Sequence, residues 1–92
     1  MSERTYSLRI VSTARRQLAE DLPEAVAFAA HEFINGPLLS DPYRVGKRLM
    51  PPLDDRYSGR RGTYRILYRI DAPRRTVTVL AVGQRGGVYR SG

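Results

Sequence analysis

The chain has 92 residues, a formal net charge of +7 and an isoelectric point near 10.6. It contains no cysteine, which excludes a disulfide framework and any thiolate metal site. The length predicts a single domain over residues 1–92, and no apolar run approaches the ~20 residues of a membrane span, so we expect a cytoplasmic protein with no membrane contact.

The positive charge lies almost entirely in the second half of the chain. Residues 1–46 contain five basic and six acidic side chains, a net charge of −1. Residues 47–92 contain eleven basic and three acidic side chains, a net charge of +8. Lys47 is the only lysine, so the basic half presents planar guanidinium groups that suit phosphates and base edges. This pattern favours a nucleic acid, and RNA in particular, as the partner.

The first half predicts one strand followed by a helical hairpin. Residues 6–11 alternate as a strand does, and Ser12 or Thr13 is placed to cap a helix directly after it. Leu22-Pro23 interrupts that helix and starts a second one, which Asn35-Gly36-Pro37 should end or kink. The predicted inward residues are Ala14, Leu18 and Leu22 of the first helix and Val26, Ala29, Ala30 and Phe33 of the second.

The second half predicts three strands, over residues 57–61, 63–71 and 75–83. In the middle strand, alternation directs Tyr64 and Tyr68 toward the helices and Arg65 to the other side. The last strand is apolar on both faces, which is typical of a central strand. The element order is β-α-α-β-β-β. We therefore predict an α+β fold, an antiparallel sheet with the N-terminal helical hairpin on one face and a partly open face rich in arginine.

The side chains that usually carry catalysis are scarce. His31 is the only histidine and lies in the second predicted helix, where a surface position is the more typical interpretation. One histidine and scattered acidic residues are too few ligands for a metal site, and no pattern in the sequence brings a serine, the histidine and an aspartate together as a catalytic triad. No phosphate-binding glycine loop is present. We expect neither a metal nor a cofactor.

What remains is the basic sheet, whose arginines alternate with tyrosines. Such an arrangement is typical of single-stranded RNA surfaces, where guanidinium groups bind phosphates and rings stack on bases. The alternative is a solvated charged face over tyrosines that belong to the core, and core packing is favoured for Tyr64 and Tyr68. The candidates are Lys47, Arg48, Arg56, Arg60, Arg61, Arg65, Arg69, Arg85 and Arg90, with Tyr57, Tyr64, Tyr68 and Tyr89.

Two segments carry a family resemblance. GKRLMPPLDDRYSGRRGTYRILYRID (residues 46–71), followed by VTVLAVGQRGGVYR (residues 77–90), resembles the RelE branch of the RelE/ParE superfamily of bacterial toxin–antitoxin toxins. The shared marks are a Gly-Lys before a Leu, a Tyr-Arg-hydrophobic-hydrophobic-Tyr strand, and a last strand that ends in Gly-x-Arg with a Tyr shortly after. The predicted element order also matches the fold of that family over nearly the whole chain.

The resemblance implies an endoribonuclease toxin that cleaves mRNA in the ribosomal A site and is neutralised by a cognate antitoxin. It implies that Arg65 neutralises the scissile phosphate and that Arg85 supports the charge of the leaving group and the phosphate. It also implies that Tyr89 stacks on a base or helps to activate the 2′-hydroxyl. Basic residues for RNA binding would be Lys47, Arg48, Arg60 and Arg61. Family members place lysines on the strand before the Tyr-Arg strand, where this chain has arginines, so the general base is not identified.

Two alternatives stay open. One is a poison of DNA gyrase, a DNA topoisomerase, as in the ParE branch, and the other is an RNA-binding or repressor-assembly homologue with weak or no catalysis. Arg85 together with Tyr89 favours the nuclease. The expected partners are the antitoxin, the ribosome and mRNA, with DNA contacted only through the antitoxin complex.

Overall fold

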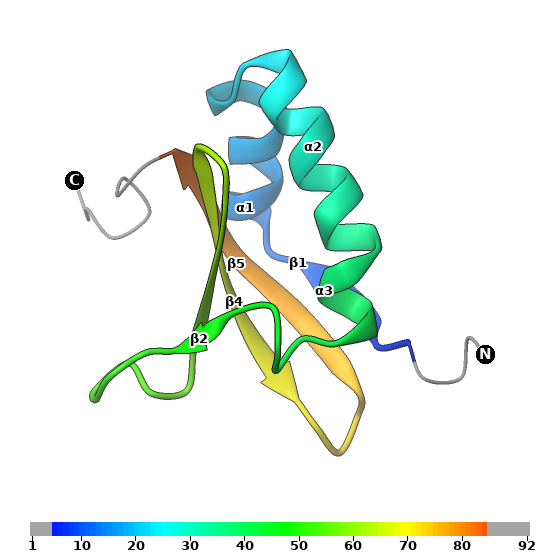
Figure 1. Cartoon of the computed structure of the whole chain (residues 1–92), viewed down its shortest axis with the longest axis vertical. Helices are drawn as coiled ribbons and strands as arrows, with labels where there is room; N and C mark the ends of the chain where they lie inside the picture. Colours follow the sequence, from blue (N-terminus) through cyan, green and yellow to red (C-terminus); the bar gives the residue numbers. More distant parts are fainter. Residues whose placement is uncertain (1–4, 85–92) are drawn as a thin grey trace.

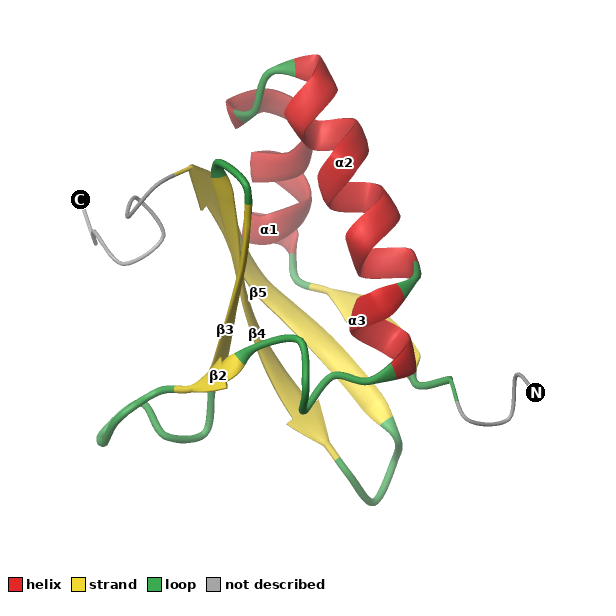
Figure 2. Ribbon diagram, viewed as in Figure 1, coloured by secondary structure: helices red, strands yellow, loops and turns green. Residues whose placement is uncertain are grey.

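A computed structural model describes residues 5–84 as a helical layer on one face of a five-stranded sheet (Figures 1 and 2). None of the helices in this range is long and apolar enough to cross a membrane. The elements are β1 (Ser7–Ile10), α1 (Ser12–Arg16), the π-helical turn η2 (Gln17–Asp21), α2 (Glu24–Asn35), α3 (Pro37–Ser40), β2 (Lys47–Arg48), β3 (Tyr57–Arg61), β4 (Tyr64–Asp71) and β5 (Thr76–Gln84).

The strand order is β1-β5-β4-β3-β2. Strands β2 to β5 pair antiparallel, but β1 pairs with β5 in parallel, so the sheet is mixed and the prediction of a purely antiparallel sheet was wrong. The reason is topological, because β1 leads straight into the helical layer and takes the free edge of β5 instead of joining a hairpin. The two-residue strand β2 is an element that the sequence did not predict.

The helical layer agrees with the sequence in its main features. Ala14 and Leu18 are buried, and the chain turns extended at Leu22, directly before Pro23. In α2 the buried residues are Ala30, Phe33 and Ile34. Ala29, predicted to face inward, is exposed, because the buried stripe is centred on Ala30 and Ile34.

Two tyrosines of β4 anchor the sheet to the helical layer. Tyr68 is fully buried, and its hydroxyl donates a 2.6 Å hydrogen bond to the carbonyl oxygen of Pro42. The hydroxyl of Tyr64 donates to the carbonyl oxygen of Ala29 at 3.2 Å. Burial raises the pKa of both phenols, so each stays protonated and able to donate. The prediction that both rings belong to the core is confirmed.

A β-bulge keeps β5 in phase with the core. Leu67 of β4 pairs with Ala81, whereas the next residue, Tyr68, pairs with Val79, so Leu80 is an extra residue in β5. The buried valines of β5 are accordingly Val77, Val79 and Val82, spaced by two and then by three. Without this insertion the end of β5 would turn its apolar side chains to solvent.

Gly46 fits where no larger residue would. A β-carbon at this position would collide with the hydroxyl of Tyr68 and would lie 3.0 Å from the carbonyl oxygen of Ser58. The glycine before Lys47 therefore permits the close approach between the β2 segment and the buried phenol.

We predict that Gly46→Ala lowers the free energy of unfolding by about 1–3 kcal/mol, because the added methyl group overpacks a fixed contact. Chemical denaturation measures the change. In a Tyr68→Phe background, where the colliding oxygen is gone, the same substitution should cost less. Strictly additive losses in the double variant would contradict this explanation.

One side chain from the helical layer holds β5 beyond its bulge. Oε1 of Gln17, the first residue of η2, accepts a 2.7 Å hydrogen bond from the backbone amide of Val82. The contact joins residues 65 positions apart in the sequence and fixes the end of β5 against the helices.

We predict that Gln17→Leu destabilises the fold by about 1–3 kcal/mol, because it leaves the Val82 amide without its acceptor. Hydrogen exchange of the Val82 amide should accelerate in this variant. Gln17→Glu keeps an acceptor oxygen and serves as the matched control. Unchanged exchange at Val82 in the leucine variant would show that the side chain does not hold the strand.

Candidate nucleic-acid interface

The face of the sheet turned away from the helices, called here the open face, carries two arginines directly opposite each other. Arg60 of β3 pairs with Arg65 of β4. Side chains at paired positions project on the same face, with β-carbons roughly 5 Å apart, and like charges there repel. Two guanidinium groups placed in this way can both reach one anion bound between the two strands.

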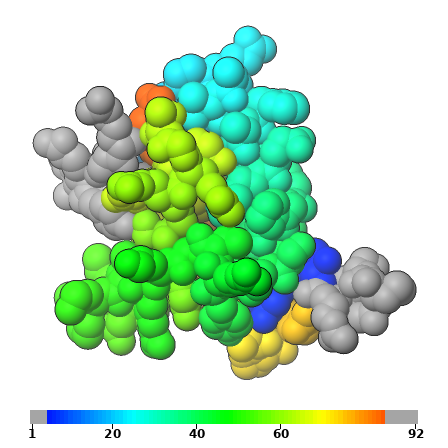
Figure 3. Space-filling model, in the orientation of Figure 1, coloured from blue at the N-terminus to red at the C-terminus, as the bar shows by residue number. Residues whose placement is uncertain are grey.

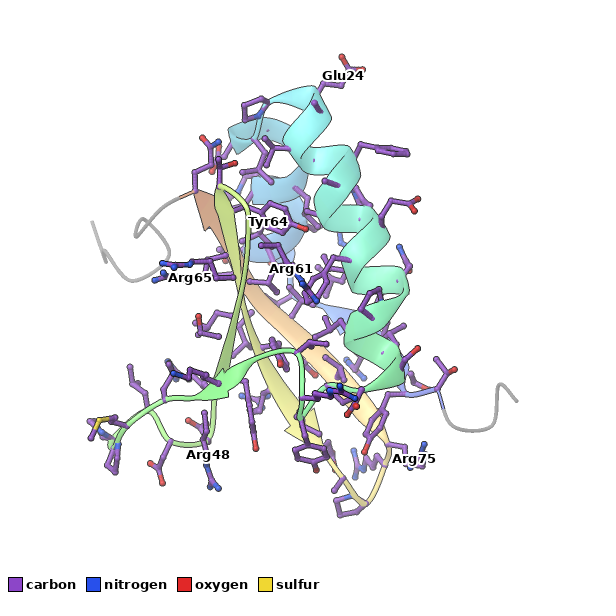
Figure 4. The ribbon with its side chains drawn as sticks, viewed as in Figure 1. Glu24, Arg48, Arg61, Tyr64, Arg65 and Arg75 are labelled. Atoms are coloured by element: carbon purple, nitrogen blue, oxygen red, sulfur yellow. The ribbon has the colours of Figure 1, made fainter. Side chains whose placement is uncertain are left out.

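Arg65 lies between Arg60 of β3 and a glycine of β5. Its neighbour on β5 is Gly83, which has no side chain. Arg65 itself is half-buried, and its side chain points away from the helices (Figure 4). The Nε atom of this guanidinium group is buried, so the group is held close to the sheet.

Lys47 belongs to the same face. It pairs with Ser58 of β3, which pairs with Leu67 of β4, so all three project on the open side. Lys47 is exposed, and as the only lysine of the chain it supplies the only side-chain amine. Three cations from three strands therefore share this surface: Lys47, Arg60 and Arg65.

Arg61 lies on the opposite side from Arg60. It pairs with the core residue Tyr64, and its guanidinium carbon lies 4.7 Å from the ring centre of Phe33 in α2, a cation–π contact. Figure 4 shows it pointing toward the helices. The structure thus separates two adjacent arginines that the sequence analysis had grouped together.

Arg48 also lies away from the open face. It pairs with Tyr57, and its Nε donates a 2.6 Å hydrogen bond to the carbonyl oxygen of Asp54. This bond closes the segment between β2 and β3, which projects from the body of the molecule (Figure 3). Arg56, in the same segment, lies 3.5 Å from a carboxylate oxygen of Asp55.

The described tyrosines do not interleave with the arginines on the open face. Tyr57 faces the helices, where its ring stacks on Tyr68 at 5.7 Å and meets Tyr43 edge-on at 5.9 Å. Together with the buried Tyr64, these rings support the fold. Core packing, the favoured interpretation for Tyr64 and Tyr68, is confirmed, and strand alternation places Tyr57 on the same side, so its interpretation as a stacking surface for bases was wrong.

The other two predicted catalytic residues, Arg85 and Tyr89, lie outside the described residues. The last described residue is Gln84 of β5, paired with Tyr64. Arg85 is the next residue in the sequence, one position beyond Gln84.

The open face has a second basic area that the sequence analysis did not assemble. Arg9 of β1, Thr78 of β5 and Arg69 of β4 form one row across three strands. They line a hollow of about 430 Å³ together with Val11, Asp71, Arg74 and Thr76. Alternation in residues 6–11 already placed Arg9 off the core face, but only the parallel pairing of β1 with β5 brings it near Arg69.

No group of three or more metal-binding side chains exists among residues 5–84. His31 is exposed on α2, in the layer that covers the other face of the sheet. In the described part of the chain, the open face therefore offers guanidinium groups, one ammonium group, hydroxyls and the Asp71 carboxylate, and no imidazole.

Comparison with known proteins gives a consistent result. Residues 4–89 match the family described as the ParE toxin of the type II toxin–antitoxin system parDE. Toxin RelG of Mycobacterium tuberculosis is 47% identical over 85 residues, which cover 92% of this chain and 97% of the relative. Toxin RelE of the same organism is 42% identical over 85 residues, covering 92% and 87%.

Solved structures agree. The toxin–antitoxin complex RelBE2 of M. tuberculosis contains a chain that is 47% identical, with a TM-score of 0.84 and coverage of 88% of this chain and 92% of the other. The isolated RelE toxin of Escherichia coli is 26% identical, with a TM-score of 0.69 and coverage of 91% and 90%. The predicted RelE-like fold is thereby confirmed.

A basic open face on a RelE-like sheet, the family match over residues 4–89 and relatives that are toxins by name lead to one assignment. The chain belongs to the ParE toxin family of type II toxin–antitoxin systems and is a toxin of the RelE type.

Proposed function

We propose that this toxin is a metal-independent endoribonuclease that cleaves mRNA on the ribosome and thereby stops translation. The observation that carries the proposal is the opposed pair Arg60 and Arg65 on the open face, beside Gly83. Two guanidinium groups that project from neighbouring strands can both donate to one phosphate that lies between them. The RelE-type relatives support the choice of RNA.

The reaction would use the nucleophile of the substrate. The 2′-oxygen forms a bond to the adjacent phosphorus, the bond from phosphorus to the 5′-oxygen breaks, the 2′-hydroxyl loses a proton and the 5′-oxygen gains one. The products are a 2′,3′-cyclic phosphate and a 5′-hydroxyl. Arg65 and Arg85 would stabilise the charge that develops on the phosphate, and Tyr89 would orient the base or the nucleophile.

Arginine serves this chemistry as a fixed donor and not as a base, because a guanidinium group does not lose its proton in proteins. The contribution of the protein is then electrostatic, and preorganised donors of this kind are worth roughly 10²- to 10³-fold each in rate. A site so poor in bases depends on precise placement of the RNA, and we propose that the ribosome provides it.

The proposed RNA surface is narrower than the set of basic residues in the sequence. It keeps Lys47 and Arg60 as RNA-binding residues, because both share a face with Arg65. It leaves out Arg61, which contacts Phe33, and Arg48, which bonds to the Asp54 carbonyl oxygen.

We further propose that a cognate antitoxin neutralises the toxin. The solved relatives include complexes of RelE with RelB from M. tuberculosis, Pyrococcus horikoshii and E. coli. An acidic partner segment would stabilise this small domain by binding only its folded state, and it would mask the open face. Contact with operator DNA would then come through the antitoxin.

We predict that Arg65→Gln lowers mRNA cleavage roughly 10²- to 10³-fold, because it removes a fixed donor to the phosphate. Mapping of transcript 5′ ends after brief expression in a bacterium measures the loss. Arg61→Gln, four residues away but on the helical side, is the matched control and should retain cleavage.

Three outcomes would contradict the proposal. One is cleavage by Arg65→Gln at the wild-type level with an unchanged fold. Another is a loss confined to Arg61→Gln. The third is damage to chromosomal DNA without breaks in transcripts, which would instead indicate a topoisomerase poison of the ParE type.

A further inference from the structure

The Arg9–Thr78–Arg69 row, which the proposed cleavage site does not use, has the properties of an anion site. The two arginines flank a threonine hydroxyl on three hydrogen-bonded strands. Both are exposed, and neither forms an ion pair or a side-chain hydrogen bond with another residue in the range 5–84. Their guanidinium groups are therefore available to a ligand.

The one carboxylate of the hollow is already engaged. Asp71 accepts a hydrogen bond from the backbone amide of Arg74 at 3.3 Å and lies 4.0 Å from the guanidinium Nε of the same residue. Three arginines and one acid leave the hollow with a net positive charge. Such a concave, positively charged surface attracts a phosphate group and repels cations.

The hollow lies on the same face as the proposed cleavage site, at the other end of β4. Arg65 and Arg69 are four residues apart on one strand, a distance of roughly 13 Å at 3.3 Å per residue. Leu67 and Ala81 lie between them on this side of the sheet, where Leu67 is buried and Ala81 is half-buried. A single nucleic-acid strand that follows β4 would meet cations at both ends.

We propose that the hollow formed by Arg9, Arg69 and Thr78 is a second phosphate-binding site, which holds the backbone of the same RNA strand that is cleaved at Arg65. The inference rests on the proposed function for the identity of the strand. The chemistry of the site requires only a phosphodiester. It would fix the direction and register of the RNA across the sheet, as phosphate contacts do in other complexes.

The test measures binding of a ten-nucleotide 2′-O-methyl RNA, which lacks the nucleophile and stays intact, to the purified toxin at several salt concentrations. Each phosphate contact to a single strand contributes about 0.7 to the slope of log K against log salt. Arg9→Gln/Arg69→Gln should make that slope shallower by about 0.7, because one phosphate contact is lost. Arg9→Lys/Arg69→Lys keeps both charges and should restore it.

Arg16→Gln/Arg44→Gln is the matched control, because it removes the same charge from positions that do not line the hollow. An unchanged slope in Arg9→Gln/Arg69→Gln, or an equal change in the control, would overturn the proposal. So would normal binding of the free RNA combined with weaker co-sedimentation with ribosomes, which would assign the contact to ribosomal RNA.

The experiments distinguish a failure of the proposed cleavage site from a failure of the proposed second phosphate site. If Arg65→Gln still cleaves mRNA while Arg9→Gln/Arg69→Gln shows the shallower slope, the assignment of the cleavage site to Arg65 is wrong and the second phosphate site stands. If Arg65→Gln is inactive and the slope of the double variant is unchanged, the cleavage site stands and the second site is wrong.

Discussion

The composition of both the core and the open face depends on how side chains alternate along β4. Tyr64, Ile66 and Tyr68 enter the core, so Arg65 and Arg69 must project on the other side. A slip of one residue would bury the guanidinium groups and expose the tyrosines, and the hydrogen bond from Tyr68 to Pro42 makes such a slip costly. The contacts that stabilise the fold are therefore the same contacts that fix which side chains lie on the open face.

The open face carries basic side chains from strands β1, β3 and β4. Arg60 and Arg65 oppose each other across two strands, and Arg9 and Arg69 flank one threonine. None of these four contributes an apolar side chain to the core. Arg61, by contrast, lies over Phe33 and adds a contact to the helical layer. Adjacent arginines in one strand thus differ in role because the strand has two faces, and a cationic sheet of this kind gains stability from a bound polyanion.

Local patterns were sufficient to predict the helical hairpin, the central position of β5 and the inward tyrosines. They were insufficient where the outcome depends on pairing between distant segments. The parallel position of β1 follows from how the helical layer returns to the sheet, and Arg9 reaches Arg69 only through that pairing. The bulge at Leu80 and the hydrogen bond from the Val82 amide to Gln17 leave no local signal in the sequence either.

At the candidate site, sequence proximity grouped Arg60 with Arg61, and only the register of β3 separated them. Arg85 and Tyr89 lie outside the described residues, so their roles stay predictions.

The most direct test of the account is an NMR titration of the toxin with an uncleavable RNA, following the guanidinium Nε–H signals of its arginines. The account predicts that Arg60, Arg65 and Arg69 shift on binding while Arg61, held over Phe33, does not. Shifts confined to Arg61 and the amides of α2 would place the RNA on the helical side and contradict it.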